Sequence, residues 1–98
     1  MYRPLPNTLT IKTSNIDGLG LFAVSDISIN TNLGITHIKD ERFDNGYSRT
    51  PLGGFFNHSD TPNCHVLYNG DFIELQTITD IKAGDEITAK YTFYNPNL

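Results

Sequence analysis

The residues best suited to chemistry lie in one short segment near the middle of the chain, residues 53–63. It reads Gly-Gly-Phe-Phe-Asn-His-Ser-Asp-Thr-Pro-Asn. The paired glycines allow another group to approach the backbone closely, or allow a positive φ, because they lack a Cβ. The aromatic pair provides an apolar anchor, and Asn57 and His58 supply donors and acceptors for a polar ligand. Taken alone, such a segment is more often a turn between buried strands than a binding site, so its function depends on the rest of the chain.

Two other segments carry groups that a ligand can use. Gly18-Leu19-Gly20 ends a turn-rich passage and leaves backbone N–H and C=O groups open to a ligand. It lacks the third glycine and the following helix of a dinucleotide-binding fingerprint, so by itself it is weak evidence. Farther on, residues 86–91 alternate in polarity, which predicts a strand with Ile87, Ala89 and Tyr91 on one face. If that face is buried, the Tyr91 hydroxyl points inward and requires a hydrogen-bond partner.

The sequence predicts no metal site. His58, Cys64 and His65 are close in sequence, but there is no second cysteine and no paired ligand spacing of the kind that binds zinc. A lone cysteine also excludes an internal disulfide and is typical of a reducing compartment. We therefore expect a cytoplasmic protein, located in the host-cell interior if the source is viral.

Length and charge limit the class of protein. With 98 residues the chain has room for one modest core, and we predict a single domain over residues 1–98. No run approaches the roughly 18 apolar residues of a membrane span, and the N-terminus lacks the apolar segment of a signal peptide. The formal net charge of −4 argues against direct nucleic-acid binding and suits a basic partner, although it is also ordinary for a soluble domain.

The elements that must position these residues are predicted to be short strands. Residues 8–13 alternate polar and apolar, as in a half-buried strand. Residues 64–68 and 72–78 are expected to be strands joined at Asn69-Gly70, because Asn-Gly favours a type I′ hairpin turn with two positive φ values. The polar stretch of residues 37–51 is expected to be a long loop or an irregular insert. No segment shows sustained helical periodicity, so the fold class is mainly β.

The chain also contains an internal similarity. Residues 24–33 can be aligned on residues 78–87, with Asp26 opposite Asp80. Asn30 then lies opposite Gly84, and these are residue types that tolerate a left-handed conformation. The alignment predicts two turns, each leading into a strand, in two small sheets related by approximate symmetry. Chance similarity over ten residues is the alternative.

Three motifs now stand in order along the chain. They are Gly-Leu-Gly-Leu-Phe-Ala at 18–23, Phe-Asn-His-Ser-Asp-Thr-Pro-Asn at 56–63 and Gly-Asp-Glu-Ile-Thr-Ala-Lys-Tyr at 84–91. Together they resemble the SET domain, a family of protein-lysine methyltransferases that use S-adenosylmethionine. Each motif alone is weak evidence, but the three in this order make the match specific. The resemblance implies a SET-domain β-clip of small sheets with a knot-like C-terminal threading.

The resemblance assigns a role to each matching position. The backbone of Gly18, Leu19 and Gly20 is expected to hold the methionine end of S-adenosylmethionine. The Asn57 side chain is expected to bond the amino group of the cofactor, and the backbone of His58 to meet the adenine. Tyr91 is the expected catalytic residue, at the meeting point of cofactor and substrate. The substrate channel is assigned to three aromatic residues, Tyr47, Phe56 and Tyr94.

The chemistry that the family performs needs residues of these types. Methyl transfer to an amine is an in-line displacement in which the cofactor supplies the reactive group, so the protein must align nitrogen, methyl and sulfur. The amine must be neutral, whereas a free lysine with a pKa of about 10.4 is protonated at pH 7. A narrow aromatic channel and the sulfonium charge both disfavour the ammonium form. Tyr91 is expected to orient the amine, so no conventional general base is required.

Several positions depart from the family pattern. Many relatives have a zinc-binding cysteine where Asp60 stands, and a cysteine-rich segment after the catalytic strand, but here the sequence ends at Leu98. We therefore expect no structural zinc. Thr92 stands where glycine is usual after the tyrosine. The short C-terminal segment after Tyr91 leaves a channel wall to be supplied by a neighbouring subunit, which predicts a homodimer.

The leading hypothesis is a minimal lysine methyltransferase that acts on a basic protein or peptide. The alternative is a catalytically inactive β-clip binding module that retains the scaffold. The presence of both Asn57 and Tyr91 favours the enzyme, because a module without activity is expected to lose one of them. A structural protein that binds neither cofactor nor lysine is a third hypothesis. The sequence does not identify the substrate protein or the number of methyl groups added.

Overall fold

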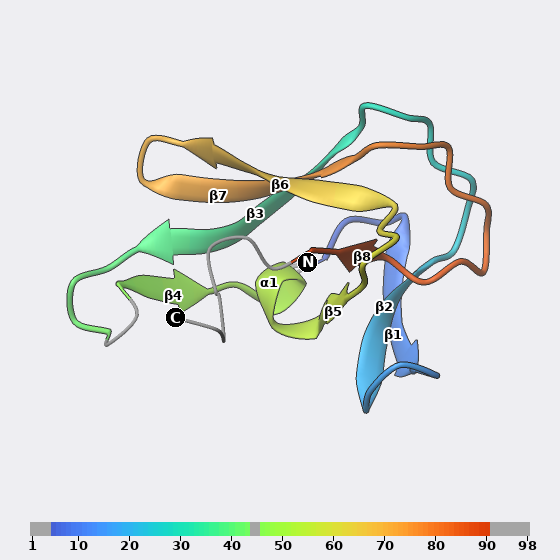
Figure 1. Ribbon diagram of the computed structural model, residues 1–98, viewed down its shortest axis with the longest axis horizontal. Coiled ribbons are helices and arrows are strands. Elements are labelled where there is room, and N and C mark those ends of the chain that lie inside the picture. The colour runs from blue at the N-terminus through green and yellow to red at the C-terminus, as the bar shows by residue number, and fades with distance from the viewer. Residues whose placement is uncertain (1–4, 44–45, 91–98) are drawn as a thin grey trace.

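The computed structural model describes residues 5–43 and 46–90, which form short strands and one short helix (Figure 1). The elements are β1 (Leu9–Thr13), β2 (Leu19–Ala23), β3 (Asn32–Lys39), β4 (Tyr47–Arg49), α1 (Pro51–Phe55), β5 (Asn57–His58), β6 (Cys64–Asn69), β7 (Phe72–Thr77) and β8 (Thr88–Ala89). The prediction of a mainly β fold is confirmed. The threading of the C-terminal end involves residues 91–98, which lie outside the described residues.

The strands form two sheets. β1 and β2 make an antiparallel pair, with Leu9 opposite Ala23. The larger sheet has the order β4-β3-β7-β6-β8-β5, in which β8 runs parallel to both β5 and β6 and the other pairs are antiparallel. β2 also reaches the end of β8, because the Ile87 N–H donates to the Leu21 carbonyl at 2.8 Å. The N-terminal pair therefore lies beside the segment that leads into β8.

The strand predicted over residues 86–91 is shorter than expected within the described part of the chain. It covers Thr88–Ala89 only, and the three consecutive residues Ile87, Thr88 and Ala89 are all buried. The face predicted to carry Ile87 and Ala89 is buried, and Thr88 between them is buried as well. β8 has a neighbouring strand on each side and is covered on both faces, as short parallel strands usually are. Tyr91 lies outside the described residues, so its predicted inward direction stays a prediction.

The hairpin of β6 and β7 forms where the sequence predicts it, with a different turn. Asn69 pairs with Phe72, so the two-residue loop is Gly70-Asp71 and not Asn69-Gly70. Gly70 has a φ of 61°, whereas neither Asn69 nor Asp71 has a positive φ. A glycine at the first loop position is typical of a type II′ turn, so the type I′ prediction is wrong. Continued cross-strand pairing extends β6 by one residue and moves the turn.

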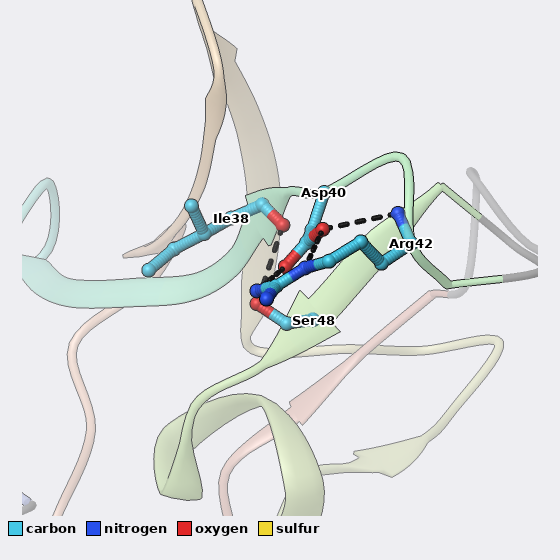
Figure 2. Close-up of polar contacts among 4 residues, drawn as sticks. All are labelled: Ile38, Asp40, Arg42 and Ser48. Carbon is cyan, nitrogen blue, oxygen red and sulfur yellow. Dashed lines mark hydrogen bonds and ion pairs between the residues drawn. The ribbon is translucent and has the colours of Figure 1, made fainter.

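The polar stretch of residues 37–51 is a hairpin rather than a loop. β3 continues to Lys39, which pairs with Tyr47 of β4. At the tip, the Arg42 guanidinium binds the Asp40 carboxylate (Figure 2). Arg42 Nε donates to Asp40 Oδ1 at 3.0 Å, and Arg42 Nη2 donates to Asp40 Oδ2 at 2.7 Å. These hydrogen bonds lower the pKa of Asp40 to about 2. Local polarity concealed the strand, because β4 is held by its pairing with β3 and not by an apolar pattern of its own.

The paired glycines of the central segment lie in the helix α1, which the sequence analysis did not predict. Thr50 caps the helix, since its Oγ1 accepts from the Gly53 N–H, and a proline begins the first turn. Neither Gly53 nor Gly54 has a positive φ. The expected close approach is confirmed at Gly53, where a Cβ would collide with the backbone carbonyl of Thr36. Among the described residues, no helix is long and apolar enough to cross a lipid bilayer.

The two aligned segments, residues 24–33 and 78–87, are related by an approximate two-fold axis, and the relation includes Ala23 and Thr77 before them. The strands that follow them, β3 and β8, belong to the same six-stranded sheet, so the prediction of two small sheets related by this symmetry is wrong. Ile27 and Ile81 exchange both backbone hydrogen bonds at 2.8 Å. The Asp80 Oδ1 accepts from the Ile29 N–H, and in the reciprocal position the Asp26 Oδ1 accepts from the Ala83 N–H, each at 2.9 Å. The two excursions run side by side between β2 and β3 and between β7 and β8 (Figure 1).

The core lies between the two sheets and under α1. Its buried members come from nearly every element: Leu9, Leu21, Ala23, Ile27, Leu33, Leu52, Phe56, Cys64, Leu75, Ile81, Ile87 and Ala89. Cys64 is fully buried, and burial raises the pKa of its thiol to about 12. The cysteine is therefore a core residue with an unreactive thiol at neutral pH.

Candidate functional site

The structure brings the first two predicted motifs into direct contact through the Asn57 side chain. Asn57 lies in β5, and its Nδ2 group is 3.2 Å from the Asp17 carbonyl and 3.3 Å from the Leu19 carbonyl. Gly18, between these carbonyls, has a φ of 46°, a conformation that glycine adopts without strain. The loop that precedes β2 therefore folds over the Asn57 amide, as the predicted cofactor site requires.

The third motif joins the same cluster through Glu86. Its Oε2 atom accepts a hydrogen bond from Asn57 Nδ2 at 2.7 Å. The Ser14 hydroxyl lies 2.8 Å from both carboxylate oxygens, and its Oγ also lies 3.1 Å from Asn57 Nδ2. Ser14, Asn57 and Glu86 are each half-buried. We call these three residues the polar cluster.

Gly20 makes room for the polar cluster. It is buried in β2, and a Cβ at this position would collide with the Glu86 carboxylate and come within 3.1 Å of Asn57 Nδ2. The second glycine of Gly18-Leu19-Gly20 is thus required by side-chain packing, whereas the first is required by its backbone conformation. The exposed Leu19 between them contributes its carbonyl to the site.

A second asparagine fixes the segment that carries Glu86. Asn63 donates from Nδ2 to the Glu86 carbonyl at 2.7 Å, and its Oδ1 accepts from the Thr88 N–H at 2.9 Å. The side chain therefore acts as an extra strand partner for residues 86–88. It ties the end of the Asn-His-Ser segment to the third motif and keeps the Glu86 side chain near Asn57.

His58 presents its backbone and its side chain to different neighbours. Its backbone pairs with Ala89 in the parallel β5–β8 ladder. Its Nε2 lies 3.2 Å from Asp60 Oδ1, and both side chains are well exposed. Asp60 is the residue at the position where the resemblance implied a zinc-binding cysteine in many relatives, and its carboxylate contacts the imidazole. The predicted contact of the His58 backbone with adenine stays a prediction.

Of the three residues assigned to the substrate channel, the structure describes Tyr47 and Phe56. Phe56 is 3% exposed and packs in the hydrophobic core. Tyr47 lies in β4, where its ring meets the ring of His37 edge-on, with 6.3 Å between centroids. Tyr91 and Tyr94 lie outside the described residues. The channel and the catalytic tyrosine therefore remain predictions.

His37 is a buried titratable group whose ring contacts that of Tyr47. Its side chain is 3% exposed, and its Nδ1 lies 2.9 Å from Thr36 Oγ1. Burial, with the positive charge of Arg49 as a smaller cause, lowers the pKa of His37 to about 4. The imidazole is consequently neutral at physiological pH, and this side of the β3–β4 hairpin carries no charge from it.

Three of the residues that build the site were not among the predicted site residues, namely Ser14, Asn63 and Glu86. Glu86 and Asn63 stand inside the quoted motifs, so their positions were a usable signal. Ser14 lies 72 residues from Glu86, and nothing in its local sequence indicates the contact. A serine in a turn is normally expected to bond its own backbone, which this one also does by accepting from the Ile16 N–H at 2.9 Å.

The polar cluster is rich in hydrogen-bond acceptors. A carboxylate, two backbone carbonyls and a hydroxyl surround the Asn57 amide. No Lys, Arg or His in the described parts of the chain pairs with Glu86, since the ion pairs found there are Arg42–Asp40 and His58–Asp60. Such an environment favours a ligand that carries a positive charge and N–H donors. A primary ammonium group meets both requirements.

Comparison with known families matches this site to one of them. The family model described as "SET domain" aligns with residues 34–92, which is more than half of the chain. The chain belongs to the SET domain family. The matched range includes Asn57, Glu86 and Tyr91, while the Gly18–Gly20 loop precedes it.

Known proteins with related sequences or structures agree with this family. Histone-lysine N-methyltransferase SMYD3 of Mus musculus and that of Homo sapiens are each 37% identical over 46 residues, which is 47% of this SET domain chain and 11% of the relative. The methyltransferase domain of human PR domain-containing protein 2 has a TM-score of 0.73 at 17% identity and covers 96% of this chain and 84% of its own. A proposed histone methyltransferase of Plasmodium falciparum, PFL0690c, has a TM-score of 0.69 at 22% identity. The similarity covers 89% of this chain and 95% of that structure. The structural similarities show the fold.

Proposed function

We propose that this SET domain transfers a methyl group from S-adenosylmethionine to the ε-amino group of a lysine in a protein substrate. The observation that carries the proposal is the contact of Asn57 Nδ2 with the carbonyls of Asp17 and Leu19 and with Glu86. It unites three motifs that are far apart in the sequence. The SMYD3 relatives are named histone-lysine methyltransferases, which supports the same class of reaction.

The residues at the polar cluster fit the amino-acid end of this cofactor. Its ammonium group needs acceptors, and the Leu19 carbonyl, the Asn57 amide oxygen and the Glu86 carboxylate are grouped here. The backbone of Gly18-Leu19-Gly20 and the side chain of Asn57 would hold this end, and the backbone of His58 would meet the adenine. When bound, the cofactor supplies a methyl group on a sulfonium, which is a reactive electrophile.

The protein's own task is to position the amine and keep it neutral. Aromatic walls exclude water from the lysine side chain, and desolvation favours the uncharged amine. We assign these walls to Tyr47, Phe56 and Tyr94. We assign the Tyr91 hydroxyl to orient the amine nitrogen toward the methyl group, which is an alignment effect and not general base catalysis.

The expected partner is a basic protein or peptide. The chain has 11 Asp and Glu against 7 Lys and Arg, so its field attracts a substrate rich in lysine. We further propose a cytoplasmic location and a homodimer in which a neighbouring subunit completes the channel. Sedimentation at micromolar concentration would test the dimer, and an active monomer would overturn it.

The test of the proposed function measures turnover and folding on the same preparation. Incubation with isotopically labelled S-adenosylmethionine and basic proteins should label lysine residues. Tyr91→Phe should reduce the rate by at least about 100-fold, as for a lost transition-state hydrogen bond, with nearly unchanged cofactor affinity. Tyr68→Phe, at an exposed position of β6, is the matched control. Cofactor binding without turnover on any basic peptide would favour the inactive β-clip module instead.

A further inference from the structure

We propose that Glu86 and Ser14 are positioning residues that fix the orientation of the Asn57 amide, so that its Oδ1 oxygen accepts from the ammonium group of the cofactor. The inference rests on the proposed function for the identity of the ligand. It assigns to the third motif a part in ligand selection that is separate from the assigned role of Tyr91.

The Asn57 amide is held in one direction. Its Nδ2 group faces four acceptors, namely Glu86 Oε2 at 2.7 Å, Ser14 Oγ at 3.1 Å, and the carbonyls of Asp17 and Leu19 at 3.2 and 3.3 Å. A flipped amide would direct Oδ1 at a carboxylate and two carbonyls, none of which donates a hydrogen bond. The acceptors therefore select one orientation, and the Glu86 carboxylate, being charged, selects it most strongly.

This orientation leaves the Oδ1 oxygen of Asn57 available to a ligand. Within the described residues, no hydrogen bond reaches Asn57 Oδ1, while every contact of the amide involves Nδ2. A ligand that meets this oxygen must donate. An ammonium group donates, whereas a ligand without N–H or O–H groups gains nothing there.

Ser14 connects Glu86 to Asn57 through two hydrogen bonds of fixed direction. A serine hydroxyl has one proton, and the Glu86 carboxylate can only accept it, at 2.8 Å. The Ser14 oxygen is then free to accept from Asn57 Nδ2 and from the Ile16 N–H. Glu86 thus orients the hydroxyl, and both groups hold the amide.

The negative charge of the Glu86 carboxylate is not neutralised by a basic side chain in the described part of the protein. Glu86 has no basic partner among residues 5–43 and 46–90, so its carboxylate keeps the surroundings of Asn57 electronegative. Gly20 allows the close packing of that carboxylate against the amide, because any Cβ there would displace it. The site is therefore built for a cationic ligand group, and Glu86→Gln removes the charge with little change in shape.

The test compares two ligands that differ in the ammonium-bearing part. S-adenosylhomocysteine has the amino-acid end, whereas 5′-methylthioadenosine lacks it. In titration calorimetry, Glu86→Gln and Ser14→Ala should each weaken S-adenosylhomocysteine by about tenfold or more, the scale of one lost charge-assisted hydrogen bond. Binding of 5′-methylthioadenosine should change less than about twofold. Equal losses for both ligands would overturn the inference, because they would indicate general distortion of the site.

Two controls separate positioning from instability. Glu74→Gln removes a carboxylate on β7 that contacts only Asn69 among the described hydrogen bonds, and it should affect neither ligand. Ser14→Thr keeps the hydroxyl and should restore most of the affinity lost in Ser14→Ala. If Ser14→Thr binds as weakly as Ser14→Ala, the hydroxyl relay is wrong.

A double-mutant cycle shows whether Glu86 acts through Asn57. Asn57→Ala alone should weaken S-adenosylhomocysteine, and Glu86→Gln in that background should add less than about a twofold loss. A full additional loss would mean that Glu86 contacts the ligand independently, which contradicts a positioning role.

A measurement without ligand distinguishes failure of this inference from failure of the proposed function. In nuclear magnetic resonance spectra of the ligand-free protein, the Asn57 side-chain amide should give two resolved signals that exchange slowly with water. In Glu86→Gln these signals should shift and exchange faster. Unchanged signals would overturn the positioning role. Absence of binding of either ligand to the unmodified protein would overturn the proposed function, with the amide signals still deciding the orientation.

Discussion

The two related excursions, residues 23–33 and 77–87, are built alike and end differently. Equivalent residues are 54 positions apart, and the hydrogen bonds occur in reciprocal pairs. The Gly84 N–H donates to the Ala23 carbonyl at 2.8 Å, as the Asn30 N–H donates to the Thr77 carbonyl at 3.0 Å. The two excursions differ two residues after this pair, where Asn32 in the first corresponds to Glu86 in the second.

The side chains at this pair of positions have different tasks. Asn32 is exposed, and its Oδ1 accepts from the Gly34 N–H of its own strand at 2.8 Å. Glu86 instead accepts from Ser14 and Asn57, which come from distant parts of the chain. The symmetric bonds stabilise the clip, and the polar cluster is added where the symmetry ends. Stability and ligand binding can therefore be changed separately, and the following experiments test that separation.

The largest expected effect comes from acid and lies outside both copies. His37 has a pKa lowered from 6.5 to about 4, so the unfolded chain binds more protons between these values. Protonation of His37 should not affect the free energy of unfolding above pH 6.5. As the pH is lowered from 6.5 toward 4, this group should reduce the free energy of unfolding by about 3 kcal/mol. His37→Gln should flatten this part of a plot of unfolding free energy against pH. An unchanged slope would place the acid-sensitive group elsewhere, for example in the carboxylates of the two copies.

The next largest effect is expected when the residue with positive φ in each excursion, Asn30 or Gly84, is replaced by its counterpart from the other. Gly84 has a φ of 95°, which a side chain rarely adopts, whereas Asn30 has a φ of 66°, within the range that asparagine tolerates. Gly84→Asn should cost about 1–2 kcal/mol of unfolding free energy. Asn30→Gly should change it by less than about 1 kcal/mol. Equal costs in urea denaturation would show that the turns are interchangeable and that the difference in φ is unimportant.

A smaller effect tests the reciprocity itself. Asp26→Ala and Asp80→Ala each leave one exposed N–H without its side-chain acceptor, so each should cost about 1 kcal/mol. The two values should agree within about 0.5 kcal/mol, and S-adenosylhomocysteine affinity should stay the same in both variants. A much larger cost for one aspartate would break the equivalence of the copies.

The smallest effect is expected at the position where the copies diverge. Asn32→Ala removes a local bond on an exposed residue and should cost no more than about 0.5–1 kcal/mol, with unchanged ligand affinity. Glu86→Gln, its counterpart, should affect binding more than melting temperature. The reverse pattern, with Asn32 important for the ligand, would contradict the division of tasks between the copies.

The sequence indicated much of the fold through local patterns. Alternation predicted β1, which spans Leu9–Thr13. Asn69-Gly70 between two strand-like segments predicted the β6–β7 hairpin, although the turn itself is one residue farther on. The alignment of the two excursions predicted their relation, and ordered motifs predicted that Gly18–Gly20 and Asn57 belong to one site. The strand, the hairpin and the relation between the excursions follow from residues close in the chain, and the contact of Asn57 with the Gly18–Gly20 loop follows from motifs of fixed order.

Only the tertiary structure decided the features that depend on distant partners. β4 exists because β3 offers it a pairing edge, and the turn at Gly70-Asp71 is set by the register of β6 against β7. β8 is covered on both faces, which the polar–apolar alternation of its sequence did not indicate.

The polar cluster shows the same division between sequence and structure. The sequence determined that Asn57 and Glu86 are present and that residue 20 has no side chain. It did not determine that Ser14, 72 residues from Glu86, meets its carboxylate. Hydrogen bonds between side chains depend on distances of about 3 Å and on direction, and such distances between remote segments are fixed only when the backbone has folded and the core has packed.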